Sequence, residues 1–207
     1  MKKNKLLSVL AIATFSTALM AADDKIDYSF SLKSWNNKIS QGTSTNQVNG
    51  TVISATAKKG DFFITGSRLL PVTYTNSSGT TLIRNDSDIA LGWSFSPNLS
   101  LLGGKKIIGS GGSSTGGFNI PYFGLNGFSS INEKSFLYGT FTRSPKVSAS
   151  SNITSNGTIT FTNYEGGYGY LWDRSTQLTA GYRSQTLSNL DPSATMAGVI
   201  FGANFSF

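Results

Sequence analysis

Apolar and polar residues alternate along most of this chain. The clearest case is the stretch 197–207, where Val199, Phe201, Ala203, Phe205 and Phe207 share one parity and the intervening residues are mostly small or polar. Successive side chains of a β-strand point to opposite faces, so this period of two predicts a strand with two different environments. No stretch of the chain beyond residue 22 shows a helical period of useful length.

Ten stretches carry this pattern, which predicts an all-β fold. Tight polar turns are expected after the second, fourth, sixth and eighth strands, whereas longer Ser/Thr/Asn/Gly-rich loops, including 36–47 and 71–86, are expected after the odd-numbered ones. Eight strands remain an alternative because the second, fifth and sixth strands are the least regular, and Pro121 indicates an irregular point in the sixth. The predicted strands span 25–35, 48–58, 61–69, 87–95, 99–108, 118–128, 135–143, 158–172, 176–187 and 197–207.

The first 22 residues have a different character. Lys2, Lys3 and Lys5 precede an apolar run over 6–20, and two alanines at 21–22 offer a small-residue cleavage site. This pattern predicts a signal peptide over 1–22 and a mature domain over 23–207. Its removal lowers Lys+Arg from 17 to 14 against 10 acidic residues, so the exported chain is only modestly basic. Without a block of basic residues, nucleic acid is not expected as a partner.

The C-terminal alternation ending on an aromatic residue, together with an export signal, resembles the insertion signal of bacterial outer-membrane β-barrel proteins. The matching residues are Phe201, Phe205 and Phe207. The resemblance implies a transmembrane antiparallel up-and-down β-barrel in the cell outer membrane, with ten strands or, alternatively, eight. It implies contact with outer-membrane lipid and lipopolysaccharide, and insertion by the barrel-assembly machinery, most simply as a monomer. The alternation of short and long connections is typical of such barrels, whose short turns are periplasmic. The alternative is a soluble secreted β-sandwich.

Aromatic residues gather near predicted strand ends. Trp93, Tyr170, Trp172 and Phe205 fall at ends that the predicted topology places on the periplasmic side, and Trp35 and Tyr182 fall towards the outer side. Membrane proteins concentrate such side chains at both membrane interfaces, so the pattern favours aromatic girdles.

One hairpin register predicts an interior ion pair. If residues 173–175 form a tight turn, Tyr170 pairs with Leu178 facing lipid, and Glu165 pairs with Arg183 facing the lumen. A lipid-facing Arg at mid-depth would cost ~2–4 kcal/mol, which favours the inward assignment. Asp27, Lys33 and Asp88 are further lumen candidates by parity. The pair is interpreted either as a constriction that sets solute charge preference or as a structural network that fills a narrow barrel.

The sequence offers little for catalysis. It contains no histidine and no cysteine, which removes the usual neutral-pH base and the common nucleophile and zinc sites. The glycine-rich run 109–117 lacks the Gly-Lys-Ser/Thr ending of a phosphate-binding loop. We therefore expect no catalytic, cofactor-binding or metal-binding residues. The function predicted is a narrow porin-like or transport protein for small solutes, and the alternative is a non-enzymatic structural or adhesin-like surface protein with a packed lumen.

Overall fold

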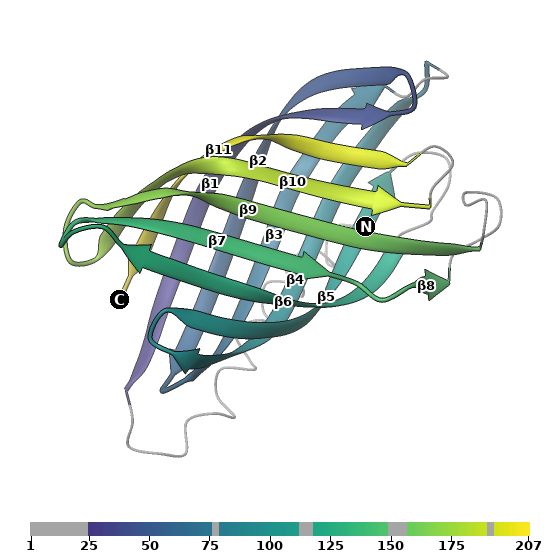
Figure 1. Ribbon diagram of the computed structural model, residues 1–207. Coiled ribbons are helices and arrows are strands. Elements are labelled where there is room, and N and C mark those ends of the chain that lie inside the picture. The colour runs from purple at the N-terminus through teal and green to yellow at the C-terminus, as the bar shows by residue number, and fades with distance from the viewer. Residues whose placement is uncertain (1–24, 76–78, 112–117, 149–156, 190–192) are drawn as a thin grey trace, which may run out of the picture.

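The structure of this chain is a computed structural model that describes residues 25–75, 79–111, 118–148, 157–189 and 193–207. Its strands form one continuous antiparallel sheet that closes on itself, because β1 pairs with both β2 and β11 (Figure 1). The strands are β1 (Ile26–Gln41), β2 (Ser44–Lys59), β3 (Phe62–Thr75), β4 (Thr81–Ser96), β5 (Leu99–Gly111), β6 (Phe118–Ser130), β7 (Ser135–Arg143), β8 (Val147–Ser148), β9 (Thr158–Leu171), β10 (Thr176–Ser188) and β11 (Ala194–Ser206).

The prediction of a ten-stranded up-and-down barrel is confirmed. Each strand of the ring lies beside its neighbours in the sequence, and β8 is only a two-residue piece that pairs with β9 beyond the end of β7. The eight-stranded alternative is wrong because all ten predicted strands form. The β-sandwich is also wrong because one closed sheet replaces two stacked ones. No helix in the described part of the chain is long and apolar enough to cross a membrane.

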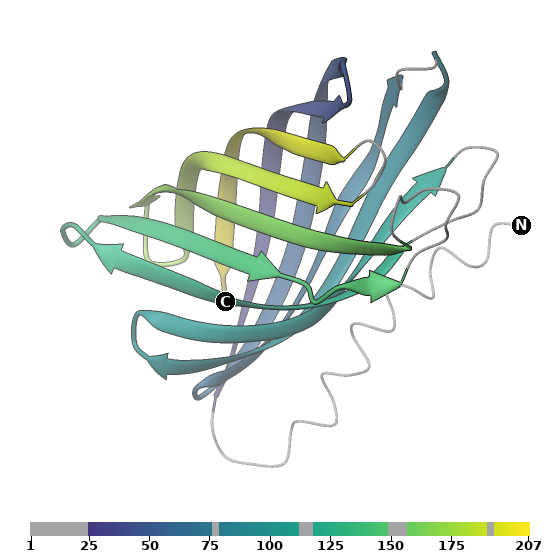
Figure 2. The ribbon, with the colours of Figure 1, turned by 45° about the vertical axis from the view of Figure 1, so that its right-hand side comes forward.

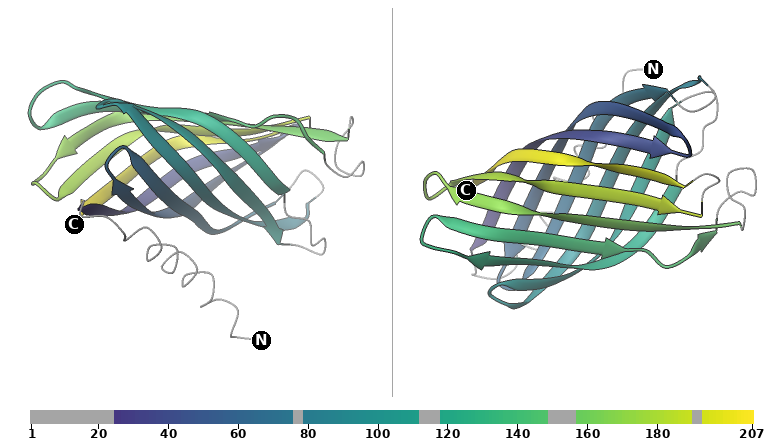
Figure 3. Two further views of the ribbon diagram at one scale, coloured as in Figure 1. Left: turned by 90° about the horizontal axis from the view of Figure 1, so that it is seen from below. Right: turned by 45° about the horizontal axis from the view of Figure 1, so that its top comes forward.

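The two ends of the barrel differ. At one end, which we call the turn end, short connections join β2 to β3, β4 to β5, β6 to β7 and β9 to β10, and the C-terminus lies there (Figure 3). We call the opposite end, where the other ends of these strands lie, the loop end. At the turn end Asp173 Oδ1 accepts hydrogen bonds from the backbone N–H of Ser175 and Thr176, each at 2.8 Å, and from the Ser175 hydroxyl at 2.9 Å. Donation from Ser175 holds the pKa of Asp173 below its usual value.

The register fixes how steeply the strands tilt. A row of paired residues that leaves β1 at Tyr28 passes through each strand in turn and returns to β1 at Ser40, a displacement of 12 residues. With ~3.3 Å per residue along a strand and ~4.8 Å between strands, this displacement corresponds to a tilt of about 40°. The strong tilt is visible in Figure 1.

The face of the sheet that carries the apolar side chains changes from outside to inside along the barrel. In the turn-end half of β1, Tyr28, Phe30 and Leu32 face outward and are exposed, while polar side chains face inward. In the loop-end half, Trp35 and Ile39 face inward and are buried, while the outward positions are Ser, Asn and Lys. The first half therefore has the pattern of a barrel in lipid, and the second half that of a barrel in water. We call this second half the extension (Figure 2).

The extension corrects two loop predictions. The predicted loop 36–47 is mostly strand, because β1 continues to Gln41 and only two residues separate it from β2. The predicted loop 71–86 is also largely strand, since β3 runs to Thr75 and β4 starts at Thr81, with a register shift between Leu69 and Val72 that accommodates Pro71. Both segments carry polar outward positions, which look like loop sequence unless the inward positions are separated from them. The prediction that every odd-numbered connection is long is therefore wrong for the first one.

The structure corrects the position expected for Trp35 and explains how Pro121 fits into a strand. Trp35 does not belong to an outer aromatic girdle, because its side chain points into the barrel and is 1% exposed. Pro121 fits within β6 at a position paired with Lys105 of β5, beyond the point where pairing with β7 begins at Phe123. There β6 has a partner on one side only, so the missing N–H of proline disrupts little.

Trp35 provides a test of the extension's core. Truncation by Trp35→Ala removes a fully buried ring, so we expect the free energy of unfolding to fall by about 3–5 kcal/mol. Trp172→Ala, at a residue that is 68% exposed, is the matched control and should cost distinctly less. Denaturant titration of the protein folded into lipid vesicles measures both. Equal losses for the two variants would contradict a packed interior in the extension.

Candidate functional site

The interior of the turn-end half holds a cavity of about 680 Å³. All ten strands of the ring contribute to its wall, and Ser, Thr and Asn are frequent among the lining residues. Pro97 and Asn98 of the β4–β5 turn belong to the lining, so the cavity reaches the turn end. On the loop side the lining stops at side chains such as Phe161 and Gln185.

A first ionic group lies in this cavity wall. Glu165 of β9 and Arg183 of β10 are directly opposite in the ladder, and Arg183 Nε lies 3.8 Å from Glu165 Oε2. Lys33 of β1 reaches the same carboxylate, with Nζ 2.5 Å from Oε1. Arg183 Nε also donates to Asn163 Oδ1 at 3.2 Å, and its guanidinium carbon lies 4.9 Å from the centre of the Trp35 ring. The carboxylate is thus held between two cations.

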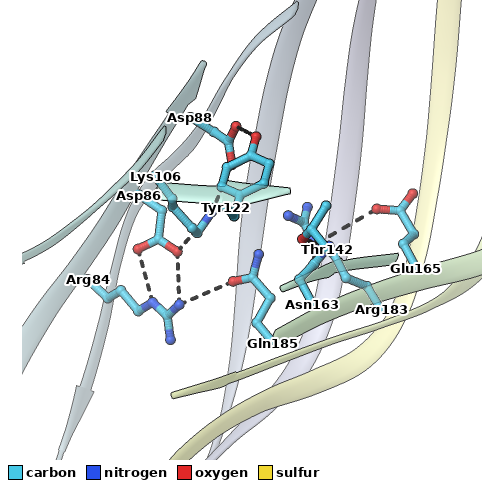
Figure 4. Close-up of polar contacts among 10 residues, drawn as sticks. All are labelled: Arg84, Asp86, Asp88, Lys106, Tyr122, Thr142, Asn163, Glu165, Arg183 and Gln185. Atoms are coloured by element: carbon cyan, nitrogen blue, oxygen red, sulfur yellow. Dashed lines mark hydrogen bonds and ion pairs between the residues drawn. The ribbon is translucent and has the colours of Figure 1, made fainter. Parts of the chain in front are cut away.

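A second ionic group lies on the facing wall (Figure 4). Arg84 Nε and Nη2 donate to the two oxygens of Asp86 at 3.1 and 2.8 Å, a bidentate contact. Lys106 Nζ lies 3.6 Å from Asp86 and 3.5 Å from Asp88. The hydroxyl of Tyr122 donates to Asp88. Arg84, Asp86 and Lys106 are each at most 7% exposed, so these charges depend on one another rather than on water.

The two walls are joined across the lumen. Arg84 Nη2 donates to Gln185 Oε1 at 3.1 Å (Figure 4). In the ring, β4 and β10 are five positions apart, so this bond connects opposite sides of the barrel. The void at this level, bounded by Asp86, Lys106 and Gln185 among others, measures only about 10 Å³. That is about the minimum space for a single water molecule. We call the two ionic groups and this bond the cross-lumen network.

Apolar side chains fill the barrel beside the network and on its loop side. They form two clusters, and none of their members is more than 8% exposed. Residues from all the ring strands except β7 extend into these clusters or into the network, so the described part of the extension has a packed interior. Together we call the clusters the loop-end core: Trp35, Ile39, Val48, Val52, Leu69, Val72, Met196 and Ile200 in one, and Ile108, Ile120, Ile159, Phe161 and Leu187 in the other.

Four of the five predicted lumen residues lie in the cavity wall. Glu165, Arg183, Lys33 and Asp88 line the cavity. Asp27 lies outside the lining at the turn-end mouth, where its side chain is 63% exposed and 3.5 Å from Lys25. The register places Tyr170 opposite Leu178, both exposed on the exterior.

Sequence reasoning missed the most buried part of the network. Arg84 and Asp86 fell inside a predicted loop, and Lys106 lay in the fifth predicted strand, which was among the least regular. A usable signal existed, because Arg84, Asp86 and Asp88 alternate with Ile83, Asn85 and Ser87, which is the period of a strand. The described residues contain no group of three or more acidic side chains placed to hold a metal ion.

The side chains on the barrel exterior show which part of the barrel lies in lipid. Large apolar side chains cover the turn-end half, including Leu91 at 66% exposed and Phe123 at 62%. The predicted girdle residues Trp93, Tyr170, Trp172 and Phe205 are all exposed in this region, near its turn-end edge. We call this surface the apolar belt. Within the belt the closed sheet leaves no unpaired backbone edge, so the chain meets both requirements for crossing a bilayer on strands. Barrels of this kind are outer-membrane proteins of bacteria, which places this chain in the cell outer membrane.

Comparisons with known proteins assign this chain to no family. No protein-family model matches the chain, and no curated protein matches it. Among solved structures it is similar to the outer membrane protease OmpT from Escherichia coli (15% identity, TM-score 0.48, covering 90% of this chain and 98% of that one). It is also similar to Neisserial surface protein A (11%, 0.43, 87% and 97%) and to Ail, the attachment invasion locus protein of Yersinia pestis (14%, 0.40, 88% and 99%). These low scores add no argument to the one from the barrel itself.

Asp86 tests the cross-lumen network. Asp86→Asn leaves the Arg84 and Lys106 charges buried without their shared partner, so we expect the free energy of unfolding to fall by about 3–5 kcal/mol. The matched change Asp27→Asn removes an exposed carboxylate whose ion pair contributes about 1 kcal/mol or less. Denaturant titration in lipid vesicles compares the two, and a loss for Asp86→Asn no larger than for Asp27→Asn would refute the structural role of the network.

Proposed function

We propose that this chain is a closed, non-enzymatic barrel that anchors a rigid, water-exposed platform in the outer membrane. The observation that supports this proposal is the packed interior of the extension. The cavity of the turn-end half is blind, because the cross-lumen network and the loop-end core lie between it and the loop end. The extension carries the loop-end connections beyond the belt, where they can contact other cells, phage or envelope components.

A narrow pore is the less favoured function. A solute entering from the loop end would have to displace side chains such as Ile120, Ile159 and Met196, all 0% exposed. It would then have to break the hydrogen bond between Arg84 and Gln185 that joins opposite walls of the barrel. Under this proposal Glu165 and Arg183 serve as structural lumen residues rather than as a selectivity constriction.

Conductance separates the two functions. In a planar bilayer we expect the purified barrel to give no channel steps above those of a protein-free membrane, because the extension is filled. A general porin reconstituted in the same way is the positive control. Reproducible steps from correctly folded protein, identified by heat-modifiable gel mobility, would reject the closed barrel and favour transport of small solutes.

We further propose that the loop end faces the outside of the cell, as short turns are periplasmic in bacterial barrels. The absence of cysteine makes the orientation accessible to labelling. On intact cells, a membrane-impermeant maleimide should label Asn49→Cys, which is exposed on the extension, and should label Arg174→Cys at the turn end only after permeabilisation. Ala55→Cys lies on the belt and should stay protected in both conditions until the protein is denatured. Labelling of Arg174→Cys alone on intact cells would reverse the orientation.

We also propose that Phe201, Phe205 and Phe207 act as an insertion signal for the barrel-assembly machinery, and that the closed ring works as a monomer. Phe207 has two separable parts, because its backbone bonds Tyr28 across the seam while its ring is 76% exposed. Phe207→Ala keeps the backbone bonds and removes the ring.

We expect Phe207→Ala to reduce the fraction of heat-modifiable protein in the outer membrane several-fold. Phe62→Ala, at another exposed aromatic residue of the turn end, is the control and should assemble normally. Normal assembly of Phe207→Ala in vivo would remove the case for an insertion signal, whatever the conductance of the barrel.

A further inference from the structure

Resting on the proposed orientation, in which the loop end faces the outside of the cell, we infer that Arg68, Lys105 and Arg143 form a binding surface on the barrel exterior for the phosphate groups of the outer-leaflet glycolipid, lipopolysaccharide. The three residues lie on β3, β5 and β7, and we call them the basic arc. Each side chain is exposed, and each has its neighbours in sequence pointing inward, such as the buried Leu69, Lys106 and Thr142. The arc therefore points away from the lumen.

The register places the three cations at one height. For a tilt of about 40°, each strand crossed along a ladder row rises ~3 Å towards the loop end, and each residue along a strand adds ~2.5 Å. Arg143 of β7 belongs to the row of paired residues that starts at Tyr28. Lys105 of β5 lies two residues beyond this row towards the loop end, and Arg68 of β3 lies four residues beyond it. Their heights above Tyr28 are then about 16, 17 and 18 Å for Arg68, Lys105 and Arg143.

This height coincides with the loop-side edge of the belt. By the same register, exposed apolar side chains continue up to Phe123, Tyr164 and Val199, which lie about 15–17 Å above Tyr28, and become sparse beyond them. The arc thus lies where hydrocarbon gives way to headgroups. Neighbouring cations of the arc are roughly 12 Å apart at their Cα atoms, so long flexible side chains can approach anionic groups between them.

The charge distribution leaves this surface without an internal partner in the described chain. Of the described acidic residues, Asp27, Asp86, Asp88 and Glu165 occupy inward positions, and Asp61, Glu133 and Asp173 lie in turn-end connections. The exposed cations of the loop-side half number five, since Lys38 and Lys146 join the arc. An exterior surface with cations and no described carboxylate attracts anions.

The position favours an anionic lipid over a soluble polyanion. The exterior around the arc is mixed, because Leu70 on β3 and Ile107 on β5 are exposed just beyond it on the loop side. An amphiphile whose phosphates lie at the top of the membrane can use the cations and the apolar side chains together, whereas a soluble polyanion uses the cations alone. Basic residues next to an anionic membrane surface contribute about five-fold each in affinity.

The test uses the full mature barrel, folded in detergent and titrated with deep-rough lipopolysaccharide and with the same material after phosphatase treatment. We expect the wild type to prefer the phosphorylated form at least ten-fold. The triple variant Arg68→Gln/Lys105→Gln/Arg143→Gln should lose this preference. The control Lys25→Gln/Lys134→Gln/Arg174→Gln removes the same charge at the turn end and should keep it.

Three results would overturn the proposal: an unchanged preference in the triple variant, an equal loss in the turn-end control, or binding of soluble polyphosphate by the wild type as tight as that of the glycolipid. Heat-modifiable mobility checks that each variant is folded. If the triple variant does not fold, Lys105→Gln alone should lose about five-fold and Lys105→Arg should restore binding. None of these outcomes depends on whether the barrel conducts.

Discussion

Closure of the sheet is the constraint on which the rest of this structure depends. In a bilayer every backbone N–H and C=O must find a partner within the protein, so a sheet with an open edge is not an option. The seam that closes this barrel joins β1 to β11 from Ser29 opposite Ser206 to Gln41 opposite Ala194, and the backbone of Phe207 extends it to Tyr28. Once the seam is fixed, the displacement of 12 residues around the ring sets the tilt, and the tilt sets which residues share a level.

The same sheet then serves two solvents. Within the belt the exterior is apolar and the lumen holds a polar cavity. In the extension the exterior is mostly polar, with Leu70, Ile83 and Ile107 as exposed exceptions, and apolar side chains fill the interior around the buried network. Both arrangements follow from one rule, that apolar side chains leave water, applied to different surroundings. Strands longer than a bilayer requires are therefore stable outside it, because the extension carries its own core.

Charged side chains also gather near the height at which the surroundings change from lipid to water. The inward side chains of Asp88, Lys106 and Arg183 lie at about the height where the exterior belt ends and the basic arc begins. Inside, ions separate a polar cavity from an apolar core and satisfy one another by direct contacts. Outside, cations mark the edge of the lipid. Charged side chains are thus concentrated around the level at which lipid gives way to water, where the inward ones stabilise the barrel and the outward ones face the membrane surface.

Local alternation was enough to favour ten strands over eight and to predict the turn-end hairpins. The turn at 173–175 was short enough to fix the register of Glu165 against Arg183, because a tight turn leaves no freedom in pairing. The long strands at the loop end were not predictable in the same way. Asn36 to Gln47 has the composition of a loop, and only the burial of Ile39 and Val48 inside the barrel shows that it is a hairpin.

The amino-acid sequence by itself determined that this chain forms alternating strands with an apolar face, because side-chain direction along a strand depends only on local geometry, and it favoured ten strands with eight as the alternative. It also determined that the chain contains no histidine and no cysteine. Only the tertiary structure decided where the apolar face turns from outside to inside, that Arg84 meets Gln185 across the lumen, and that Arg68, Lys105 and Arg143 share one level. These relations join residues far apart in the chain, and they exist only after closure of the barrel has fixed the register of every strand.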